Sequence, residues 1–200
     1  MNTNFDKLSP EETGKLFPIE VVPYREEWTR LFEDEKQLIF NVLKDVEALN
    51  IEHIGSTSII GLSAKPIIDI LIEVKTLDNE HKILIVNIMK NIGYGNMFNS
   101  EKEKSMEFGK GYTPNGFAGQ TYHAHFREKT ADLQDEIYFR DYLRQNKKAR
   151  DEYVALKRSL AEKYKYNREA YTQAKTGFIK QIVDCAKKQN NENVVNTLNN

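Results

Sequence analysis

The chain has 200 residues, 40% of them hydrophobic, which is enough for one domain with a substantial core of its own. Its 29 basic and 30 acidic residues nearly cancel, so no overall field attracts nucleic acid or an anionic membrane, and neither is expected as a partner. The only cysteine, Cys185, excludes an intrachain disulfide and any multi-cysteine zinc site. No apolar run approaches the ~20 residues of a membrane helix and the first residues lack an apolar signal core, so we expect a cytoplasmic protein.

Three segments are expected along the chain. Residues 1–18 are polar and contain two prolines, which predicts a loosely held arm, and the asparagine-rich residues 187–200 predict a frayed tail. Residues 19–186 are expected to form a single domain. Within it, apolar residues at helical spacing predict a long first helix over 26–46, and a short strand is expected at 51–54.

The middle of the domain predicts strands around a second helix. Residues 66–74 form an almost continuous apolar run after a proline, which is typical of a central strand buried on both faces. An amphipathic helix between 77 and 92 is expected next, ended by Gly93, and then GYGNMF and KSMEFGKGY predict strands of a hairpin or meander. In QTYHAHFRE apolar and polar residues alternate, so we expect a strand with His123 and His125 on its polar face.

The rest of the domain predicts three helices: one from about Asp132 to Gln145, one in which Tyr153, Leu156, Leu160 and Tyr164 recur at helical spacing, and one that follows a cap at Asn167. The fold class expected is α/β (α+β). It consists of a mixed sheet of about four to six strands flanked by helices, with a helical C-terminal portion.

A carboxylate inside an apolar strand is the first sign of a functional site. An ionised side chain at Asp69 costs several kcal/mol unless it is paired or bound to a metal. Ahead of this strand, Gly55, Ser56, Thr57 and Ser58 supply a flexible turn whose free backbone N–H groups and hydroxyls can hold a phosphate. The alternatives are an ordinary capped turn and a structural carboxylate satisfied by backbone N–H groups or a nearby lysine.

The stretch His53–Val74, HIGSTSIIGLSAKPIIDILIEV, resembles the signature of the GrpB-like family, uncharacterised bacterial proteins whose domain belongs to the nucleotidyltransferase superfamily. The likeness extends to IEVVPYREEWTRLFEDE upstream and to FRDYLR, YVALK and YTQAKTGFI downstream, and it covers roughly residues 19–186. The resemblance implies a nucleotidyltransferase-like fold. It also implies that the turn Gly55–Ser58 binds phosphate and that Asp69 is the first metal-binding carboxylate, holding Mg²⁺.

The chain departs from the superfamily pattern after this aspartate. Active members usually carry a second carboxylate two residues further on, where this chain has Leu71, and Glu73 lies roughly 13 Å from Asp69 at ~3.3 Å per residue. A carboxylate or imidazole from another strand would have to complete a metal site. His123 and His125 are the candidates, and two imidazoles at this spacing can also chelate a transition metal. The alternatives are solvated or hydrogen-bonded histidines, or a histidine that acts on the phosphates without metal.

Several cations could add contacts to an anion. Lys65 precedes the strand of Asp69, and Arg127, Arg140 and Arg144 are further candidates for substrate binding. The alternative is that they form salt bridges with the abundant acids.

The resemblance also includes Tyr171 and Lys175, which share one face of the last helix. We expect packing and surface pairing from them first, and substrate contacts second. The other charged residues between Lys147 and Lys188 are expected to form solvated helix faces.

Three functions are therefore considered. The first is a Mg²⁺-dependent nucleotidyltransferase that moves a nucleoside monophosphate from a nucleoside triphosphate to an unknown acceptor. The second is a catalytically incomplete nucleotide-binding or regulatory module, which Leu71 favours. The third is a phosphohydrolase with a transition metal on Asp69, His53, His123 and His125. The expected partner is a nucleotide or another phosphate-bearing small molecule, and a protein partner stays open.

Overall fold

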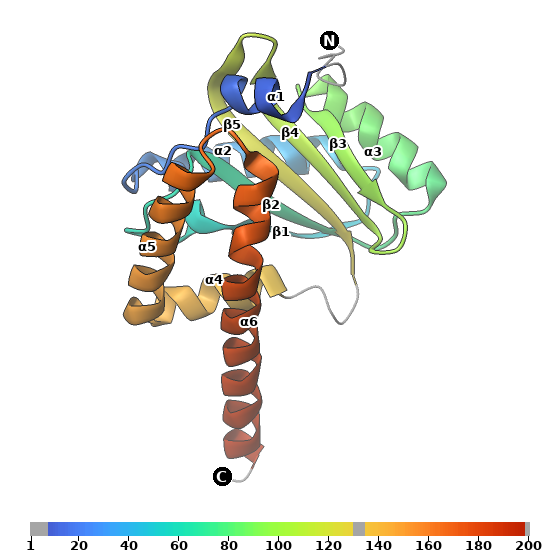
Figure 1. Cartoon of the computed structure of the whole chain (residues 1–200). Helices are drawn as coiled ribbons and strands as arrows, with labels where there is room; N and C mark the ends of the chain where they lie inside the picture. The colour runs from blue at the N-terminus through green and yellow to red at the C-terminus, as the bar shows by residue number, and fades with distance from the viewer. Residues whose placement is uncertain (1–7, 130–134, 199–200) are drawn as a thin grey trace.

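A five-stranded mixed sheet lies at the centre of the computed structural model, which describes residues 8–129 and 135–198 (Figure 1). The strands run in the order β1-β2-β5-β4-β3, with bounds Ala48–Ile54, Ile67–Val74, Gly116–Glu128, Ser105–Thr113 and Gly95–Ser100 respectively. Strands β2 and β5 are parallel, and the other neighbouring pairs are antiparallel. The predicted mixed sheet is thereby confirmed, and two of its inner strands carry the aspartate and the two histidines.

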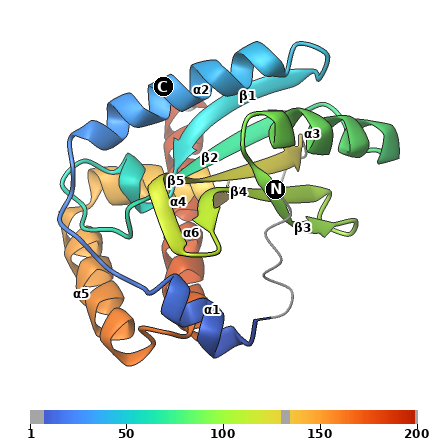
Figure 2. The ribbon, with the colours of Figure 1, turned by 90° about the horizontal axis from the view of Figure 1, so that it is seen from above.

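Helices cover both faces of this sheet. Figure 2 shows α2 (Glu27–Val42) and α3 (Asn79–Asn91) on one face. The C-terminal helices α4 (Asp135–Gln145), α5 (Lys147–Lys163) and α6 (Arg168–Leu198) lie on the other (Figures 1 and 2). The α+β fold with a helical C-terminal portion is therefore confirmed. None of the helices in the described ranges is long and apolar enough to cross a membrane.

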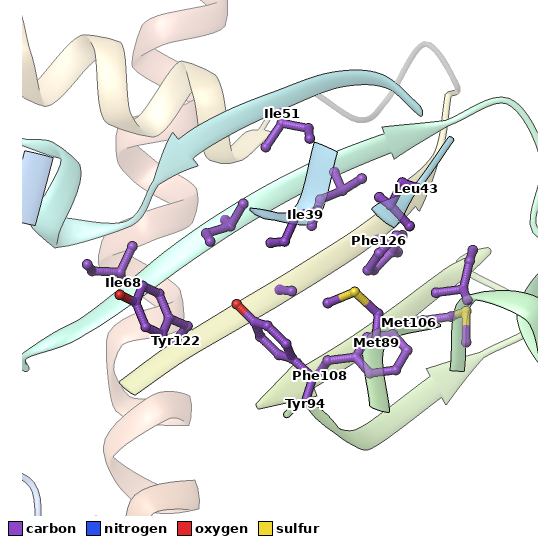
Figure 3. Close-up of a cluster of buried hydrophobic side chains, with 14 of the residues drawn as sticks. Ile39, Leu43, Ile51, Ile68, Met89, Tyr94, Met106, Phe108, Tyr122 and Phe126 are labelled. Atoms are coloured by element: carbon purple, nitrogen blue, oxygen red, sulfur yellow. The ribbon is translucent and has the colours of Figure 1, made fainter. Parts of the chain in front are cut away.

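The larger hydrophobic core lies between the sheet and helices α2 and α3 (Figure 3). Successive side chains of a strand point to opposite faces, and Ile68 and Ile70 of β2 and Tyr122 and Phe126 of β5 enter this core. Asp69 and the histidines alternate with these residues. Their side chains therefore point to the other face, toward the C-terminal helices.

A second, smaller core joins that other face to the C-terminal helices. Ile59 and Leu62, which follow the Gly-Ser turn, pack in one buried cluster with Phe139 of α4, Tyr153 of α5 and Ile182 of α6. The turn is consequently held between the sheet and the helices, because the residues on both sides of it belong to packed elements.

The first predicted helix ends earlier than expected. Helix α2 stops at Val42 with Leu43 as its C-cap, and β1 already begins at Ala48. Val46 is nevertheless buried in the larger core from a turn in which its N–H donates to the carbonyl of Leu43. The helical spacing of apolar residues therefore extends beyond the end of α2, because the turn after the helix buries Val46 in the same core as the helix.

The segment expected to be an arm is partly packed against the domain. Ser9 and Glu12 form the capping box of a short helix, α1 (Pro10–Leu16), and Phe17 after it is buried. In α1 the backbone at Gly14 lies so close to Tyr166 that a Cβ would clash with its carbonyl oxygen. Residues 1–7 of the expected arm lie outside the described residues, and the segment expected to fray continues α6 as far as residue 198.

Candidate functional site

Strand pairing brings three of the predicted site residues together. Asp69 of β2 and His123 of β5 are register partners on adjacent parallel strands, and His125 follows two residues later on the same face. Nδ1 of His123 and Nε2 of His125 each lie 3.3 Å from Oδ1 of Asp69. One ligand atom from each of the three residues lies within 4.8 Å of the others. This spacing allows all three side chains to contact one metal ion.

The far nitrogen of each imidazole ring also has a partner. The hydroxyl of Tyr112 lies 2.6 Å from Nε2 of His123, and Nδ1 of His125 contacts the carboxylate of Glu107. Arg127 pairs with the same carboxylate at 2.6 Å. Both rings are therefore fixed from two sides, with one nitrogen each directed at Asp69.

The protonation of this group follows from burial and from its internal contacts. Burial alone would raise the pKa of Asp69, but hydrogen bonds from His123 and His125 outweigh it and hold that pKa far below its ordinary value. Burial lowers the pKa of His123, and Asp69 opposes this only in part. Burial also acts on His125, but the carboxylates of Asp69 and Glu107 outweigh it and raise the pKa of this imidazole to about 9.

The Gly-Ser turn lies directly beside the aspartate. Gly55 has a φ of +67°, a left-handed conformation that favours glycine, and a Cβ at this position would lie 2.4 Å from Oδ2 of Asp69. Ser56 begins a short 3₁₀ segment, Ser56–Ser58, and its Oγ accepts a hydrogen bond from Nζ of Lys157 at 3.0 Å. The backbone of Gly55 and the hydroxyl of Ser56 thus lie beside the space next to Asp69.

The other two residues of the turn do not face this space. The buried Thr57 hydroxyl donates to a carbonyl at the start of β2 and lies 3.0 Å from Nε2 of His53, and Ser58 Oγ donates to the carbonyl of Gly55 at 2.7 Å. Both hydroxyls are used by the fold, so we no longer expect them to bind phosphate.

His53 likewise has a structural role. Its ring stacks on Phe32 with 4.5 Å between the centroids, and burial lowers its pKa to about 4. It is a neutral ring packed under helix α2, and it does not belong to the group of Asp69, His123 and His125. The expectation that His53 shares a metal with these residues is therefore not supported.

A cavity of about 730 Å³ opens beside Asp69, between the sheet and the C-terminal helices. Lys65 before β2, Lys157 of α5 and Lys175 of α6 all line it. Lys157 donates to Ser56 Oγ and to a backbone carbonyl, whereas Lys65 and Lys175 lie over the ring of Tyr171 at 5.4 and 4.5 Å from its centroid. Within the described ranges, no ion pair joins any of the three to a carboxylate.

These three lysines are buried close to one another, which shifts their pKa values. Burial and, after it, nearby cations lower the pKa of Lys65 and of Lys157 to about 7, although Asp69 acts in the opposite direction on Lys65. The pKa of Lys175 is lowered for the same reason. An anion bound between the three ammonium groups would stabilise their charged forms.

The predicted arginines are used elsewhere. Arg140 is buried and donates to Glu52 at 2.8 Å and to a carbonyl of β1, and Arg127 pairs with Glu107. Arg144 donates to a backbone carbonyl of the Gly-Ser turn at 2.9 Å. None of the three lines the cavity. Their ion pairs and carbonyl contacts correspond to the structural alternative considered for them, whereas Lys65 and Lys175, which were also candidates from the sequence, line the cavity.

Sequence reasoning missed three residues. Lys157, expected on a solvated helix face, is only 2% exposed, and Glu107 and Tyr112 of β4 hold the two histidines. A signal for Lys157 exists in YVALK, because Tyr153 lies four residues before it on the same helix face. At the place of the expected second carboxylate, Leu71 is fully buried, so imidazoles and not a second acid stand beside Asp69.

Comparisons with known proteins agree on one family. Residues 18–184 match the family described as GrpB protein. The glutamate-rich protein GrpB of Alkalihalophilus pseudofirmus is 35% identical over 165 residues, which cover 82% of this chain and 93% of that protein. The UPF0157 protein YqkA of Bacillus subtilis is 33% identical over 177 residues, which cover 86% of this chain but only 49% of that protein.

Solved structures show the same relationship. The crystal structure of the conserved protein GrpB from Enterococcus faecalis has a TM-score of 0.73 and 33% identity, covering 85% of this chain and 98% of that one. The Cid1 poly(U) polymerase in its MgGTP-bound form is more distant, with a TM-score of 0.47 and 13% identity over 70% of this chain and 44% of that one. A likeness this distant says nothing about activity.

Proposed function

Because this chain belongs to the GrpB family and its cavity is lined by three buried lysines that form no ion pair among the described residues, we propose that it binds a nucleoside triphosphate and transfers the nucleoside monophosphate to an acceptor. The lysine group carries the proposal. A buried ammonium costs free energy, and three of them around one cavity make sense when a polyphosphate occupies it. The resemblance of the Gly-Ser turn and the Asp69 strand to the nucleotidyltransferase superfamily supports a nucleotide as the source of that phosphate.

The size of the cavity and its lining agree with such a ligand. A volume of about 730 Å³ lies within the range of cavities that hold small molecules and cofactors. Ser56 offers a hydroxyl and the backbone of its turn, and Lys65, Lys157 and Lys175 approach from three different elements. A triphosphate could therefore be held from several sides, as positioning for transfer requires.

In the proposed reaction an acceptor oxygen attacks the α-phosphorus. A new phosphorus–oxygen bond forms, the bond from the α-phosphorus to the bridging oxygen breaks, pyrophosphate leaves, and the proton of the acceptor hydroxyl passes to solvent. Charge develops on the leaving pyrophosphate, where preorganised ammonium groups stabilise it. Lys157 and Lys175 are placed for that role.

The magnesium ion expected from the superfamily does not fit the donor atoms beside Asp69. Magnesium prefers an octahedron of oxygen ligands and usually takes one or two carboxylates. This cavity offers one carboxylate and two imidazole nitrogens, and Leu71 takes the place of the second acid. The lysines, and not magnesium, therefore carry the neutralisation of phosphate charge in the proposed reaction.

Calorimetric titration of the purified chain with ATP, GTP, CTP and UTP tests the binding step. At least one is expected to bind saturably, and Lys157→Met is expected to weaken that binding about tenfold or more, since a charge-assisted hydrogen bond contributes about 1.5–3 kcal/mol. Lys148→Met on the same helix is the control, because that side chain is 89% exposed and should leave affinity unchanged. Failure of all four nucleotides to bind, or equal effects of the two substitutions, would contradict the proposal.

A hydrolase for phosphate esters is the second candidate. The two imidazoles beside Asp69 favour it, because histidine and carboxylate together are the ligands of catalytic zinc in hydrolases. The products separate the two reactions. With an α-labelled nucleotide, hydrolysis releases labelled free nucleotide without any acceptor, whereas transfer leaves the label on an acceptor. Binding without either product would instead support a regulatory module.

A further inference from the structure

We propose that Asp69, His123 and His125 form a binding site for one divalent transition metal ion of the zinc class. Each residue would supply one ligand atom, and at least one coordination position would stay open toward the cavity. The inference goes beyond the proposed transfer, because metal binding at these three residues requires neither a nucleotide nor turnover.

The distances from Asp69 to the two rings are compatible with a shared ion and are long for direct ion pairs. A carboxylate that accepts a charge-assisted hydrogen bond from an imidazole usually lies about 2.7–2.9 Å from the nitrogen. In this chain Oδ1 of Asp69 lies 3.3 Å from Nδ1 of His123 and 3.3 Å from Nε2 of His125. Two ligands on a tetrahedral zinc ion, each about 2.0–2.1 Å from the metal, lie roughly 3.3 Å apart.

The residues behind the rings favour the same conclusion. An ionised carboxylate only accepts hydrogen bonds, so the contact of Glu107 with Nδ1 of His125 places a proton on that nitrogen. The opposite nitrogen, Nε2, faces Asp69, and when a metal displaces its proton its lone pair points to the ion. This arrangement of carboxylate, histidine and ion is the usual support of a metal-binding histidine. On the other ring, Tyr112 contacts Nε2 of His123 and leaves Nδ1 for the ion.

The donor set also decides the class of metal. Two imidazoles and one carboxylate suit zinc, iron, cobalt and related ions, whereas magnesium and calcium prefer oxygen ligands throughout. Three protein ligands leave a position for water or substrate, as in catalytic sites. That position opens to the cavity, because all three residues line it together with Ser56 and the lysines.

The test uses the full chain without a histidine tag. Purified protein, stripped of metal by a chelator and dialysed, is titrated with Co²⁺ while its visible absorption is recorded, and bound Zn²⁺ is counted by elemental analysis. We expect one Co²⁺ ion to bind per chain. One equivalent of Zn²⁺ should replace this Co²⁺, whereas a large excess of Mg²⁺ should leave it bound. His123→Gln and His125→Gln should each abolish the cobalt spectrum. His81→Gln, on a histidine whose ring contacts Asp78 at the start of α3, should retain it.

Glu107 is expected to position the ring of His125 and not to bind the ion itself. Glu107→Gln should therefore weaken metal binding about 10–100-fold without abolishing it. Circular dichroism shows whether each variant is folded. If His125→Gln does not fold, His123→Gln and the wild-type titration decide. The proposal is overturned if wild-type protein binds no cobalt, if Mg²⁺ displaces the ion, or if the folded histidine variants bind like His81→Gln.

Failure of this site and failure of the proposed function can be told apart. Cobalt is titrated without nucleotide, and nucleotide is titrated with chelator-treated protein. A metal without nucleotide binding would leave the site standing and overturn the transferase proposal. If the protein binds a nucleotide but no cobalt, the metal site is overturned and the transferase proposal stands.

Discussion

Lys157 is the residue with the least expected environment, because a lysine that is 2% exposed keeps its ammonium group away from water. Burial lowers its pKa to about 7, and Lys175 and Lys65 across the cavity contribute in the same direction. An unfolded lysine keeps its proton up to a pKa near 10.5. The destabilisation of the free protein is therefore fully present below about pH 7, and its stability increases as the pH rises from 7 toward 10.5.

A bound polyphosphate should reverse this shift. At pH 8 the free protein holds Lys157 and Lys65 mostly neutral, whereas phosphate groups, with a pKa near 6, are fully ionised. Binding of the tightest nucleoside triphosphate at pH 8 should therefore take up about one to two protons, and affinity should fall from pH 7 to pH 9. Calorimetry in buffers of different ionisation enthalpy measures the uptake. If binding takes up no protons, or if Lys157→Met takes up as many as the wild type, protonation of these lysines does not accompany nucleotide binding.

Arg140 should behave as a structural residue. It is buried against Glu52, Asp141 and a carbonyl of β1, and its removal leaves these groups without their cation. Arg140→Ala should lower the free energy of unfolding by about 2–3 kcal/mol, less than for fully enclosed pairs because both carboxylates reach solvent. Nucleotide affinity should stay within about twofold, or roughly 0.4 kcal/mol.

Denaturant unfolding measures the first quantity. Arg30→Ala is the control, because that arginine pairs with Asp34 on an exposed helix face, 70% accessible, and should cost no more than about 1 kcal/mol. If the two variants lose equal free energy of unfolding, Arg140 has no special structural role. A large loss of nucleotide affinity in Arg140→Ala would show that Arg140 binds the ligand.

The residues that could be predicted from sequence are those that break a strand pattern. Asp69 interrupts an apolar run, and His123 and His125 occupy the polar positions of an alternating strand. Lys157 lies among many charged residues of a helix, where a lysine at the buried face and one at the solvated face look alike. Tyr153 marks the helix face that carries Lys157, but whether this face meets the cavity depends on docking against distant elements, so the placement of Lys157 required the structure.

Among the elements, the Gly-Ser turn and β2 depend on each other. The left-handed φ of Gly55 brings its backbone against the carboxylate of Asp69, which leaves no room for a Cβ. The order of turn and strand could be predicted from the chain. Their contact could not, since it arises when β1 and β2 pair antiparallel and Ile54 becomes the register partner of Asp69.

Gly55→Ala tests this contact. The new Cβ would lie 2.4 Å from Oδ2 of Asp69, so either the turn or the carboxylate must move. We expect a loss of about 2–3 kcal/mol in unfolding free energy, from backbone strain together with the clash, and loss of cobalt binding at Asp69. Gly61→Ala is a matched control, because Gly61 has a φ of +79° with nothing within 4 Å of an added Cβ.

In the control only the backbone strain should remain, about 1 kcal/mol, with cobalt binding intact. Denaturant unfolding and cobalt titration give both quantities. If Gly55→Ala binds cobalt like wild type and loses no more stability than Gly61→Ala, the turn does not position the aspartate.

At the scale of the whole molecule, the cavity lies where two packed units meet. The sheet with α2 and α3 forms the larger core, and the C-terminal helices form the smaller one with Ile59 and Leu62. Asp69 belongs to the first unit, while Lys157 and Lys175 come from α5 and α6 of the second. A polyphosphate in the cavity would therefore connect the two units through charge, in addition to the apolar contacts of the smaller core.

This arrangement predicts where a ligand slows hydrogen exchange. The tightest nucleoside triphosphate should protect amides of β2, of α5 around Lys157 and of the first half of α6 around Lys175, because opening either unit would break the new ionic contacts. Residues 188–192 of α6, which follow the last residue that lines the cavity and are exposed, should not change. Mass-spectrometric exchange with and without ligand measures this pattern, and Lys157→Met should lose the protection of α5 first. Protection confined to β2 would mean that the helices take no part in binding.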